Sequence, residues 1–307
     1  MTKQRFTSIA DVMADLQEKA SQRNKPTESW KPPEKHGVDE YECNICKDTE
    51  LIIGKNEKGY DVATFCECKE RNAWKRRFKQ SMLPEEFRKA NFENYVNQAP
   101  IQKRMIELTK SYQQRFDVVT GEDGRKEKII PPNNFGLVAV FGEQRIKELP
   151  VGDRTAIKQE HNNFGIGKTH LQIALAKQLI KQGFSVLIIS DAVFMDDLMQ
   201  ARRANDEGES LNKLLYNVLE ADVVVWDDMG KAKWTEPKES MYYRIINERY
   251  RKQKPIVFNS NEDRGTLAEK IGYAAASRLI GGCWVEGEDF EYLLDAEGQD
   301  WRLKRSV

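Results

Sequence analysis

The sequence lacks the features that mark membrane, secreted and strongly basic proteins. No apolar run in its 307 residues approaches the roughly 18 that a membrane span needs, and the first residues have no signal-peptide core. The 49 Lys and Arg residues balance 49 Asp and Glu residues, so any nucleic-acid-binding surface would have to be local. We therefore expect a cytoplasmic protein, long enough for two domains.

Histidine and cysteine are scarce. With three histidines and no activated cysteine–histidine pair, the sequence predicts no nucleophilic catalyst. Four of the five cysteines lie within residues 43–68, and the fifth, Cys283, is expected to be buried in a terminal strand beside Trp284. This grouping is unlike a disulfide framework and indicates one metal site.

The metal site is predicted at two close cysteine pairs, Cys43 with Cys46 and Cys66 with Cys68. Residues 51–53 and 62–65 suit the strands of a small ribbon, which would place four thiolates around one structural zinc ion. The alternative is four buried, reduced cysteines without a metal. We assign residues 36–80 to this ribbon and a basic helix.

Before the ribbon, residues 1–35 are interpreted as an amphipathic helix followed by a linker. Apolar residues spaced by three and four positions between Phe6 and Ala20 predict a helix over 6–20. That helix either packs on its own protein or is presented to a partner.

After the ribbon, residues 69–79 hold six Lys or Arg residues, with Trp74 and Phe78 between them. Such a stretch either binds single-stranded nucleic acid through phosphates and stacked bases or is a solvated helix whose aromatics face inward. Residues 81–134 are expected to be a connecting helical segment, with a helix near 100–117 and a polar boundary at 118–134.

From residue 135 to 307 the pattern changes to apolar runs that alternate with helical stretches. The runs at 136–141, 185–190, 222–226 and 255–259 predict an α/β fold with a parallel sheet covered by helices on both faces. Residues 290–299 are interpreted as a small insertion without an assigned role.

A glycine-containing loop opens the first helix of this region, with the sequence Gly165, Ile166, Gly167, Lys168, Thr169, His170. Backbone N–H groups and the positive end of a helix bind phosphates in such a loop. Lys168 is expected to bridge the β- and γ-phosphates of ATP and Thr169 to bind Mg²⁺. We assign all six residues to the nucleotide site.

The phosphate-loop pattern requires another glycine five residues before Gly167, where this chain has Asn162. The preceding apolar run ends at Gly142, and removal of residues 143–162 would leave a continuous strand, loop and helix. We therefore expect an insertion at 143–162 that forms a surface excursion.

Polar residues follow two later apolar runs. Asp227 and Asp228 directly follow the run at 222–226. Asp227 is expected to hold Mg²⁺, and Asp228 is expected to orient or deprotonate the attacking water. Asn261 follows the run at 255–259 and is our choice for a sensor of the γ-phosphate or water.

Several stretches together resemble the DnaC/DnaI/IstB-like AAA+ ATPases over residues 40–307. They are YECNICKDT at 41–49, FCECKER at 65–71, LPEEFRKANFENY at 83–95, GIGKTHLQIALA at 165–176, VVVWDD at 223–228, PIVFNSN at 255–261 and AAASRLI at 274–280. Their order is more similar to DnaI-like helicase loaders than to transposition ATPases, which in general lack the cysteine ribbon.

The resemblance implies an ATP-dependent loader that binds a hexameric replicative helicase and single-stranded DNA in DNA replication and self-associates. It also implies that Arg278 reaches the nucleotide of an adjacent subunit and that Arg302 senses nucleotide in its own. Two alternatives stay open. One is a transposition helper ATPase, and the other is a zinc-containing adaptor that does not hydrolyse ATP because its phosphate loop is interrupted.

Overall fold

The computed structural model describes residues 41, 43–55, 59–69, 72, 88–121 and 124–304. The chain divides into two compact units, one up to Cys66 and one from Glu67 onward. The helix predicted at 6–20, the linker after it and most of the basic stretch at 69–79 lie outside the described residues, so these predictions stay open.

The first unit contains a two-stranded antiparallel hairpin. Strand β1 (Leu51–Lys55) pairs with β2 (Asp61–Phe65), with Leu51 opposite Phe65 and Lys55 opposite Asp61. All ten strand residues are exposed, so the hairpin has no apolar core of its own. A small segment of this kind needs another source of stability, such as a bound metal.

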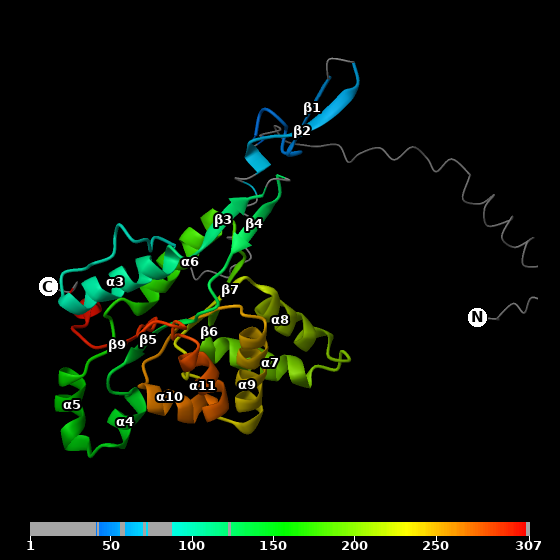
Figure 1. Ribbon diagram of the computed structural model, residues 1–307. Coiled ribbons are helices and arrows are strands. Elements are labelled where there is room, and N and C mark those ends of the chain that lie inside the picture. Colours follow the sequence, from blue (N-terminus) through cyan, green and yellow to red (C-terminus); the bar gives the residue numbers. More distant parts are fainter. Residues whose placement is uncertain are drawn as a thin grey trace, which may run out of the picture. The chain divides into compact units, whose positions relative to one another are not determined.

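The second unit is built on a five-stranded sheet in which all the strands run parallel. The strand order is β6-β7-β8-β5-β9 (Figure 1). The strands are β5 (Phe135–Ala139), β6 (Val186–Ser190), β7 (Val223–Asp227), β8 (Ile256–Asn259) and β9 (Leu293–Ala296). The first four of them match the apolar runs of the sequence.

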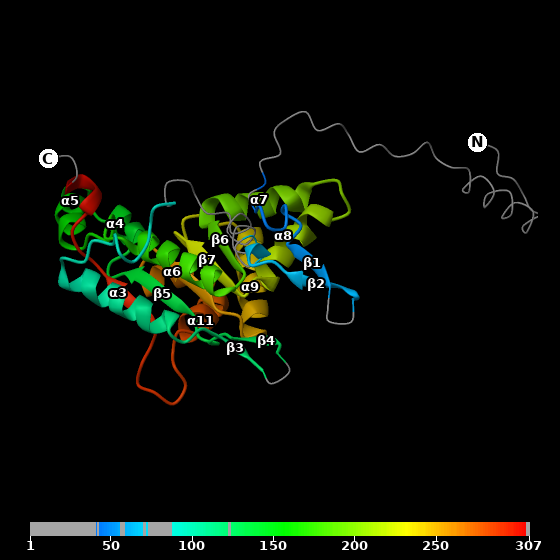
Figure 2. The same cartoon turned by 90° about the horizontal axis from the view of Figure 1, so that it is seen from above.

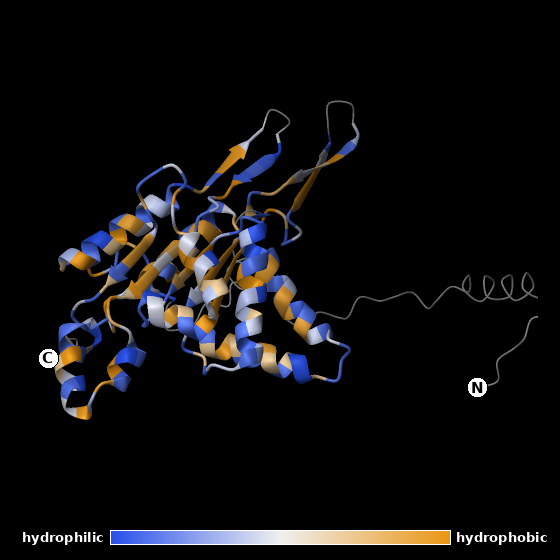
Figure 3. Cartoon of the chain, turned by 60° about the horizontal axis from the view of Figure 1, so that its bottom comes forward, coloured by the Kyte–Doolittle hydropathy of each residue, from blue (hydrophilic) through white to orange (hydrophobic). Residues whose placement is uncertain are grey.

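Helices cover both faces of this sheet, as the continuous apolar runs predicted (Figures 2 and 3). On β7, Val223 and Val225 join one core cluster, while Val224 and Trp226 join the other. The first cluster is covered by α3 (Pro100–Gln113) and α6 (Lys168–Gln182). The second is covered by α7 (Asp191–Arg203), α8 (Glu209–Glu220), α9 (Glu236–Arg251), α10 (Arg264–Ile271) and α11 (Tyr273–Gly281).

The segment before the sheet differs in part from the prediction. Helix α3 ends at Gln113, and the polar stretch expected to be only a boundary forms a hairpin of β3 (Asp117–Thr120) and β4 (Lys126–Ile129). Hydrogen bonds join Gly121 to Arg125 and Gly124 to Gly121 in its turn. The two strands read DVVT and KEKI, without a regular alternation of polar and apolar residues, so the local pattern gave no strand signal.

The interpretation of residues 290–299 as an insertion was wrong. These residues contain β9, which pairs with β5 along its whole length, from Gly136 opposite Leu293 to Ala139 opposite Ala296. Cys283 is fully buried as expected, but it follows α11 rather than lying in a strand. After β9 the described chain ends in the short helix α12 (Trp301–Lys304).

The segment expected to be an insertion forms two helices, α4 (Glu143–Glu148) and α5 (Val151–Glu160), and α4 lies beside the start of α10, where Arg145 donates to Thr266 Oγ1 at 3.2 Å (Figure 1). Every residue of α5 is at least partly exposed. The two ends of the segment lie together, because the Asn163 side chain donates to the Phe141 carbonyl at 3.2 Å and the Phe141 ring stacks on His161. The segment therefore leaves and rejoins the sheet at one place.

Candidate nucleotide and zinc sites

The glycine loop leads into α6 in the conformation that its glycines permit. Gly165 has a φ of +65° and Gly167 a φ of +98°, and both values lie in the left-handed region. Tyr95 packs against Gly167 so closely that a Cβ there would lie 2.5 Å from its ring. The Tyr95 hydroxyl also donates to the Ile166 carbonyl at 3.2 Å. The loop is thus held from one side by a residue 71 positions away.

Lys168 is buried at the start of α6, with 6% of its surface exposed. Its Nζ donates to the Asn163 carbonyl at 3.0 Å and to Asn261 Oδ1 at 2.9 Å. Burial lowers the pKa of Lys168 to about 8, although the charges of Asp228 and Asp227 act in the opposite direction. Such a desolvated ammonium group is suited to neutralise phosphate charge.

Asp227 ends β7 and faces the first turn of α6. Its Oδ1 accepts hydrogen bonds from Thr169 Oγ1 at 2.8 Å and from Asn259 Nδ2 at 2.6 Å. Burial raises the pKa of Asp227, and the neighbouring charge of Asp228 raises it further. A hydroxyl and a carboxylate in contact are oxygen ligands of the type that Mg²⁺ prefers, so these two residues fit a magnesium ion.

Asp228 follows at once, with a φ of +53° that is unusual for a residue other than glycine. Its N–H donates to Asn259 Oδ1 at 3.0 Å, and its carboxylate accepts from Asn261 Nδ2 at 3.0 Å. Asn261 therefore contacts both Lys168 and Asp228. The ends of β7 and β8 and the start of α6 bring together Lys168, Thr169, Asp227, Asp228 and Asn261.

The other predicted residues have different surroundings. The His170 side chain contacts the segment that precedes α3. Its Nε2 lies 2.8 Å from the Asn91 carbonyl, and its ring lies beside Tyr95. Its contact with nucleotide stays a prediction. Arg278 donates to the Ala274 carbonyl and stacks on the Tyr243 ring, with its Cζ atom 5.3 Å from the ring centroid. Arg302 lies close enough to Lys168 for its charge to lower the pKa of that lysine further.

The sequence interpretation missed Tyr95 and Asn163 and assigned no separate role to Asn259. Asn259 is fully buried and joins Asp227, Asp228 and Gln172 through its amide group. Its position directly after an apolar strand was the available signal. Tyr95 gave no local signal, because its contact with the loop arises only when the chain folds back.

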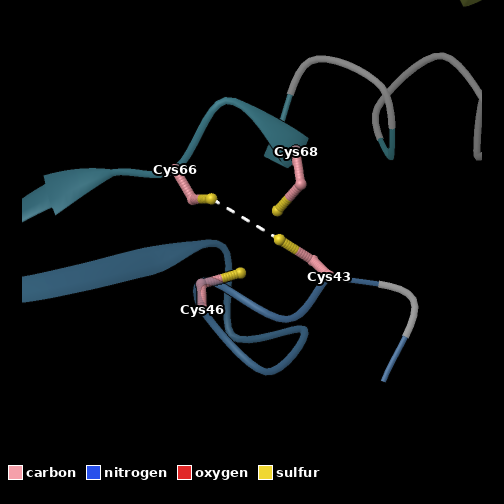
Figure 4. A group of neighbouring side chains, drawn as sticks. All are labelled: Cys43, Cys46, Cys66 and Cys68. Atoms are coloured by element: carbon pink, nitrogen blue, oxygen red, sulfur yellow. Dashed lines mark hydrogen bonds between the residues drawn. The ribbon is translucent and has the colours of Figure 1, made fainter. Parts of the chain in front are cut away.

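Four cysteine sulfurs lie together at the open end of the β1–β2 hairpin (Figure 4). Two of the cysteines precede β1 and two follow β2. Cys43, Cys46, Cys66 and Cys68 are all buried, and their sulfur atoms lie within 4.8 Å of one another. The Cys43 and Cys66 sulfurs are 3.7 Å apart. Tetrahedral zinc–sulfur bonds of about 2.3 Å require sulfurs about 3.8 Å apart, so the cluster fits zinc.

The first cysteine pair is set by a tight turn. Lys47 and Asp48 have positive φ values of 50° and 63°, the Lys47 N–H donates to the Cys43 carbonyl, and Asp48 Oδ1 accepts from the Cys43 N–H. Backbone N–H groups of Cys46 and Ile45 lower the pKa of the Cys43 thiol to about 6. A thiolate is the form that binds a metal, so this turn prepares Cys43 as a ligand.

Comparison with known families agrees with the geometry of the nucleotide site. Residues 161–276 match the family described as IstB-like ATP binding protein. The match begins at His161, directly after α5, and includes the glycine loop, Asp227, Asp228 and Asn261. The match bears out the resemblance to the IstB group, and the observed parallel sheet covered by helices confirms the predicted α/β fold class.

This chain is similar to curated proteins of two kinds. An insertion sequence IS5376 putative ATP-binding protein of Geobacillus stearothermophilus is 35% identical over 47% of this chain and 57% of its own length. The replicative helicase loader DnaC of Escherichia coli is 26% identical over 38% of this chain and 46% of its own length. The chain thus spans about half the length of these two relatives.

A third relative is similar over nearly its whole length. The phage-like element PBSX protein XkdC of Bacillus subtilis is 25% identical over 100% of this chain and 98% of its own length. Among solved structures, one titled "Crystal structure of the DnaC helicase loader" is 19% identical, with a TM-score of 0.47, and covers 64% of this chain and 96% of that one. Within the described residues, no helix is long and apolar enough to cross a membrane.

Proposed function

We propose that the protein is an ATPase of the helicase-loader type, which hydrolyses ATP to ADP and phosphate and thereby controls its binding to a hexameric replicative helicase and single-stranded DNA. One observation carries the ATPase part of this proposal. Lys168, Asn261 and Asp228 form a connected hydrogen-bonded chain at the sheet edge where α6 begins. A phosphate-binding cation and a water-binding carboxylate are therefore joined through one amide.

Each residue has a distinct role in the proposed reaction. The Lys168 ammonium binds the β- and γ-phosphates and neutralises charge in both the ground and the transition state. Asp228 orients the attacking water and accepts its proton. Asn261 positions the Lys168 and Asp228 side chains relative to each other and contacts the γ-phosphate. Arg278 acts on the nucleotide of an adjacent subunit, and Arg302 on the nucleotide of its own.

Thr169 and Asp227 would hold Mg²⁺, which supplies charge neutralisation at the phosphate oxygens when it is bound. The 2.8 Å contact between their oxygen atoms places both groups where one cation could bind them. Cys43, Cys46, Cys66 and Cys68 would hold a structural zinc ion. Four sulfur ligands leave no open position on the metal, so this ion would support the fold rather than the chemistry.

Two features support the loader over the transposition helper. The cysteine cluster belongs to the DnaI-like pattern that the sequence resembles, and DnaC is among the relatives. The stretch at 69–79, which directly follows this cluster in the sequence, has the mixture of basic and aromatic residues that single-stranded DNA binding uses. The transposition helper remains a second candidate, because two insertion-sequence relatives are 32% and 35% identical to this chain.

Binding to purified partners tests the proposal. The immobilised hexameric replicative helicase of the host and, in parallel, an insertion-sequence transposase are each incubated with the full chain and ATP, ADP or no nucleotide. We expect nucleotide-dependent capture by the helicase alone, and loss of the nucleotide dependence in Lys168→Ala. Capture by the transposase alone would contradict the loader and favour the second candidate.

A further inference from the structure

The segment that follows β9 crosses the phosphate loop. The Gly298 N–H donates to the Asn162 carbonyl at 2.6 Å, and the Trp301 N–H donates to the Gly165 carbonyl at 3.2 Å. His161 Nδ1 lies 2.9 Å from Glu297 Oε2. We call residues 297–301 the strap. It contacts the loop on the residues that precede Lys168 and is part of the same compact unit.

Asn162 has the largest share of these contacts. Its Nδ2 donates to the Gly298 carbonyl at 2.5 Å and to the Phe164 carbonyl at 2.9 Å, so one amide ties the loop to the strap. Asn162 and Gly298 are thus joined by two hydrogen bonds, one from the Asn162 side chain to the Gly298 carbonyl and one from the Gly298 N–H to the Asn162 carbonyl. Asn162 is also the residue that stands where the phosphate-loop pattern has its first glycine. A glycine could not make the side-chain contact.

The strap lies tightly against the loop. A Cβ on Gly165 would lie 1.7 Å from Asp300 Oδ1, and a Cβ on Gly298 would lie 3.6 Å from the Ile166 side chain of the loop. The same Asp300 oxygen accepts from the Arg302 N–H at 2.9 Å, which fixes the start of α12. Arg302 therefore leaves the strap directly beside the loop, in agreement with the effect of its charge on Lys168.

We infer that the strap positions the phosphate loop and Arg302 relative to each other, and that Asn162 is the positioning residue through which it does so. In a phosphate loop, several N–H groups must converge on one phosphate. In this chain α4 and α5 lie between strand β5 and the loop, so the strand does not fix the start of the loop directly. The loop therefore needs a second support. The strap supplies that support, and Arg302 follows directly after it, close enough to Lys168 for its charge to act on that lysine. The inference rests on the proposed ATP binding for its ligand.

The test uses the full chain with Asn162→Ala and Asn162→Gly, the second of which restores the glycine of the motif. Asn212→Ala, on the exposed side of α8, is the matched control. Thermal unfolding first establishes that each variant is folded. Hydrogen exchange of residues 162–168 is then measured without nucleotide, and the affinities for ATP and ADP are measured by titration.

We expect about fivefold or faster exchange of the loop amides in both Asn162 variants, because a lost hydrogen bond makes local opening easier. The ratio of ATP to ADP affinity should fall about fivefold in Asn162→Ala and in Arg302→Ala, and no further in the double variant, because the two residues act as one unit. A change in general stability would lower both affinities and leave the ratio unchanged.

Unchanged exchange in the Asn162 variants, or additive effects in the double variant, would overturn the inference. An increase in ATP affinity in Asn162→Gly would also overturn it, because the asparagine would then be a defect in the loop. The exchange measurement needs no nucleotide, so it decides whether the strap holds the loop even if the chain binds no ATP. Absence of ATP binding would contradict the proposed function and not this inference.

Discussion

Asp228 has a backbone conformation that ordinary side chains seldom adopt. A φ of +53° costs roughly 1 kcal/mol for a residue with a Cβ, and the structure offsets this cost with hydrogen bonds from the Asp228 N–H to Asn259 and from Asn261 to the carboxylate. The turn aims the Asp228 carboxylate toward Asn261, while Asp227 faces Thr169. Two adjacent carboxylates thus have separate surroundings and can serve separate functions.

Replacement of Asp228 by asparagine isolates its charge, because asparagine tolerates the left-handed region better than other residues. We expect ATP turnover to fall at least ~100-fold in Asp228→Asn, the usual effect of removing a general base. ATP affinity and the thermal midpoint should stay close to those of the wild type. Steady-state turnover, nucleotide titration and calorimetry measure the three quantities, with Asp289→Asn in an exposed loop as the control. Loss of ATP binding would contradict this division of roles.

At the level of single residues, the sequence was informative where a motif ends a buried strand or begins a helix. Lys168, Thr169, Asp227, Asp228 and Asn261 could be placed together in advance, because parallel strands end at one sheet edge. Contacts that depend on distant packing could not be foreseen. Tyr95 reaches Ile166 across 71 positions and Asn162 reaches Gly298 across 136 positions, with no local pattern to indicate either.

At the level of elements, strands with continuous β-branched runs were predictable and the last strand was not. Strand β9 has the sequence LLDA and is flanked by acidic residues, so its composition indicates a loop. It forms a strand because β5 offers it an open edge, and its two leucines are buried. This is a case of tertiary pairing that overrides a weak local preference.

Deletion of α4 and α5 tests whether they are a separable excursion. The variant joins Gly142 to His161 through two added glycines, which the contacts between Phe141, His161 and Asn163 make geometrically possible. We expect folding and ATP binding to be retained, because α5 contributes no buried residue and α4 only Ile146. Circular dichroism and nucleotide titration measure both.

A folded deletion variant without ATP affinity would show that these helices supply nucleotide contacts. The start of α4 is the place to examine in that case. The Glu143 N–H donates to the Asn261 carbonyl, and Arg145 forms an ion pair with Asp263 at 2.9 Å. A variant with Arg145→Ala alone, which keeps the backbone bond, separates the two contacts.

Glu220, at the end of α8, gives the fold a pH dependence of known sign. Ion pairs with Lys252 and Lys254 lower the pKa of Glu220 from 4.5 to about 2. Because the folded value is the lower one, the stabilisation is complete above about pH 5 and is lost as the pH falls from 4.5 toward 2. The pairs are exposed, so the effect is at most ~1 kcal/mol.

Urea unfolding of wild type and Glu220→Gln between pH 7 and pH 3 measures this effect. We expect a constant difference in unfolding free energy down to about pH 5 and a shrinking difference below it. Glu209→Gln, at the other end of α8, is the matched control. A difference that grows as the pH falls would have the wrong sign and would contradict the ion-pair assignment.

At the scale of the whole molecule, the two units owe their stability to different sources. The second unit has two apolar clusters on either side of a sheet, whereas the hairpin of the first exposes all ten strand residues. The sequence already indicated this contrast through the position of the cysteines. It could not indicate how far the apolar clusters extend, because that depends on helices packed from both ends of the chain.

Zinc removal should therefore affect the two units unequally. We expect one zinc ion per chain, lost in Cys66→Ser, with the sheet-containing unit still folded because its core is apolar. Elemental analysis gives the metal content, and calorimetry follows the unfolding of the larger unit. Cys283→Ser, at a buried cysteine outside the cluster, should keep its zinc. Full zinc content in Cys66→Ser would remove the proposed site.

Hydrolysis of ATP by the full chain tests the central claim most directly, because the glycine loop lacks its first glycine and is preceded by two helices. Phosphate release is measured with Mg²⁺, with and without single-stranded DNA, for wild type and Lys168→Ala. We predict turnover by the wild type that depends on Mg²⁺ and is abolished in Lys168→Ala. A folded wild-type chain that neither binds nor hydrolyses ATP, or a Lys168→Ala variant with full turnover, would contradict the account.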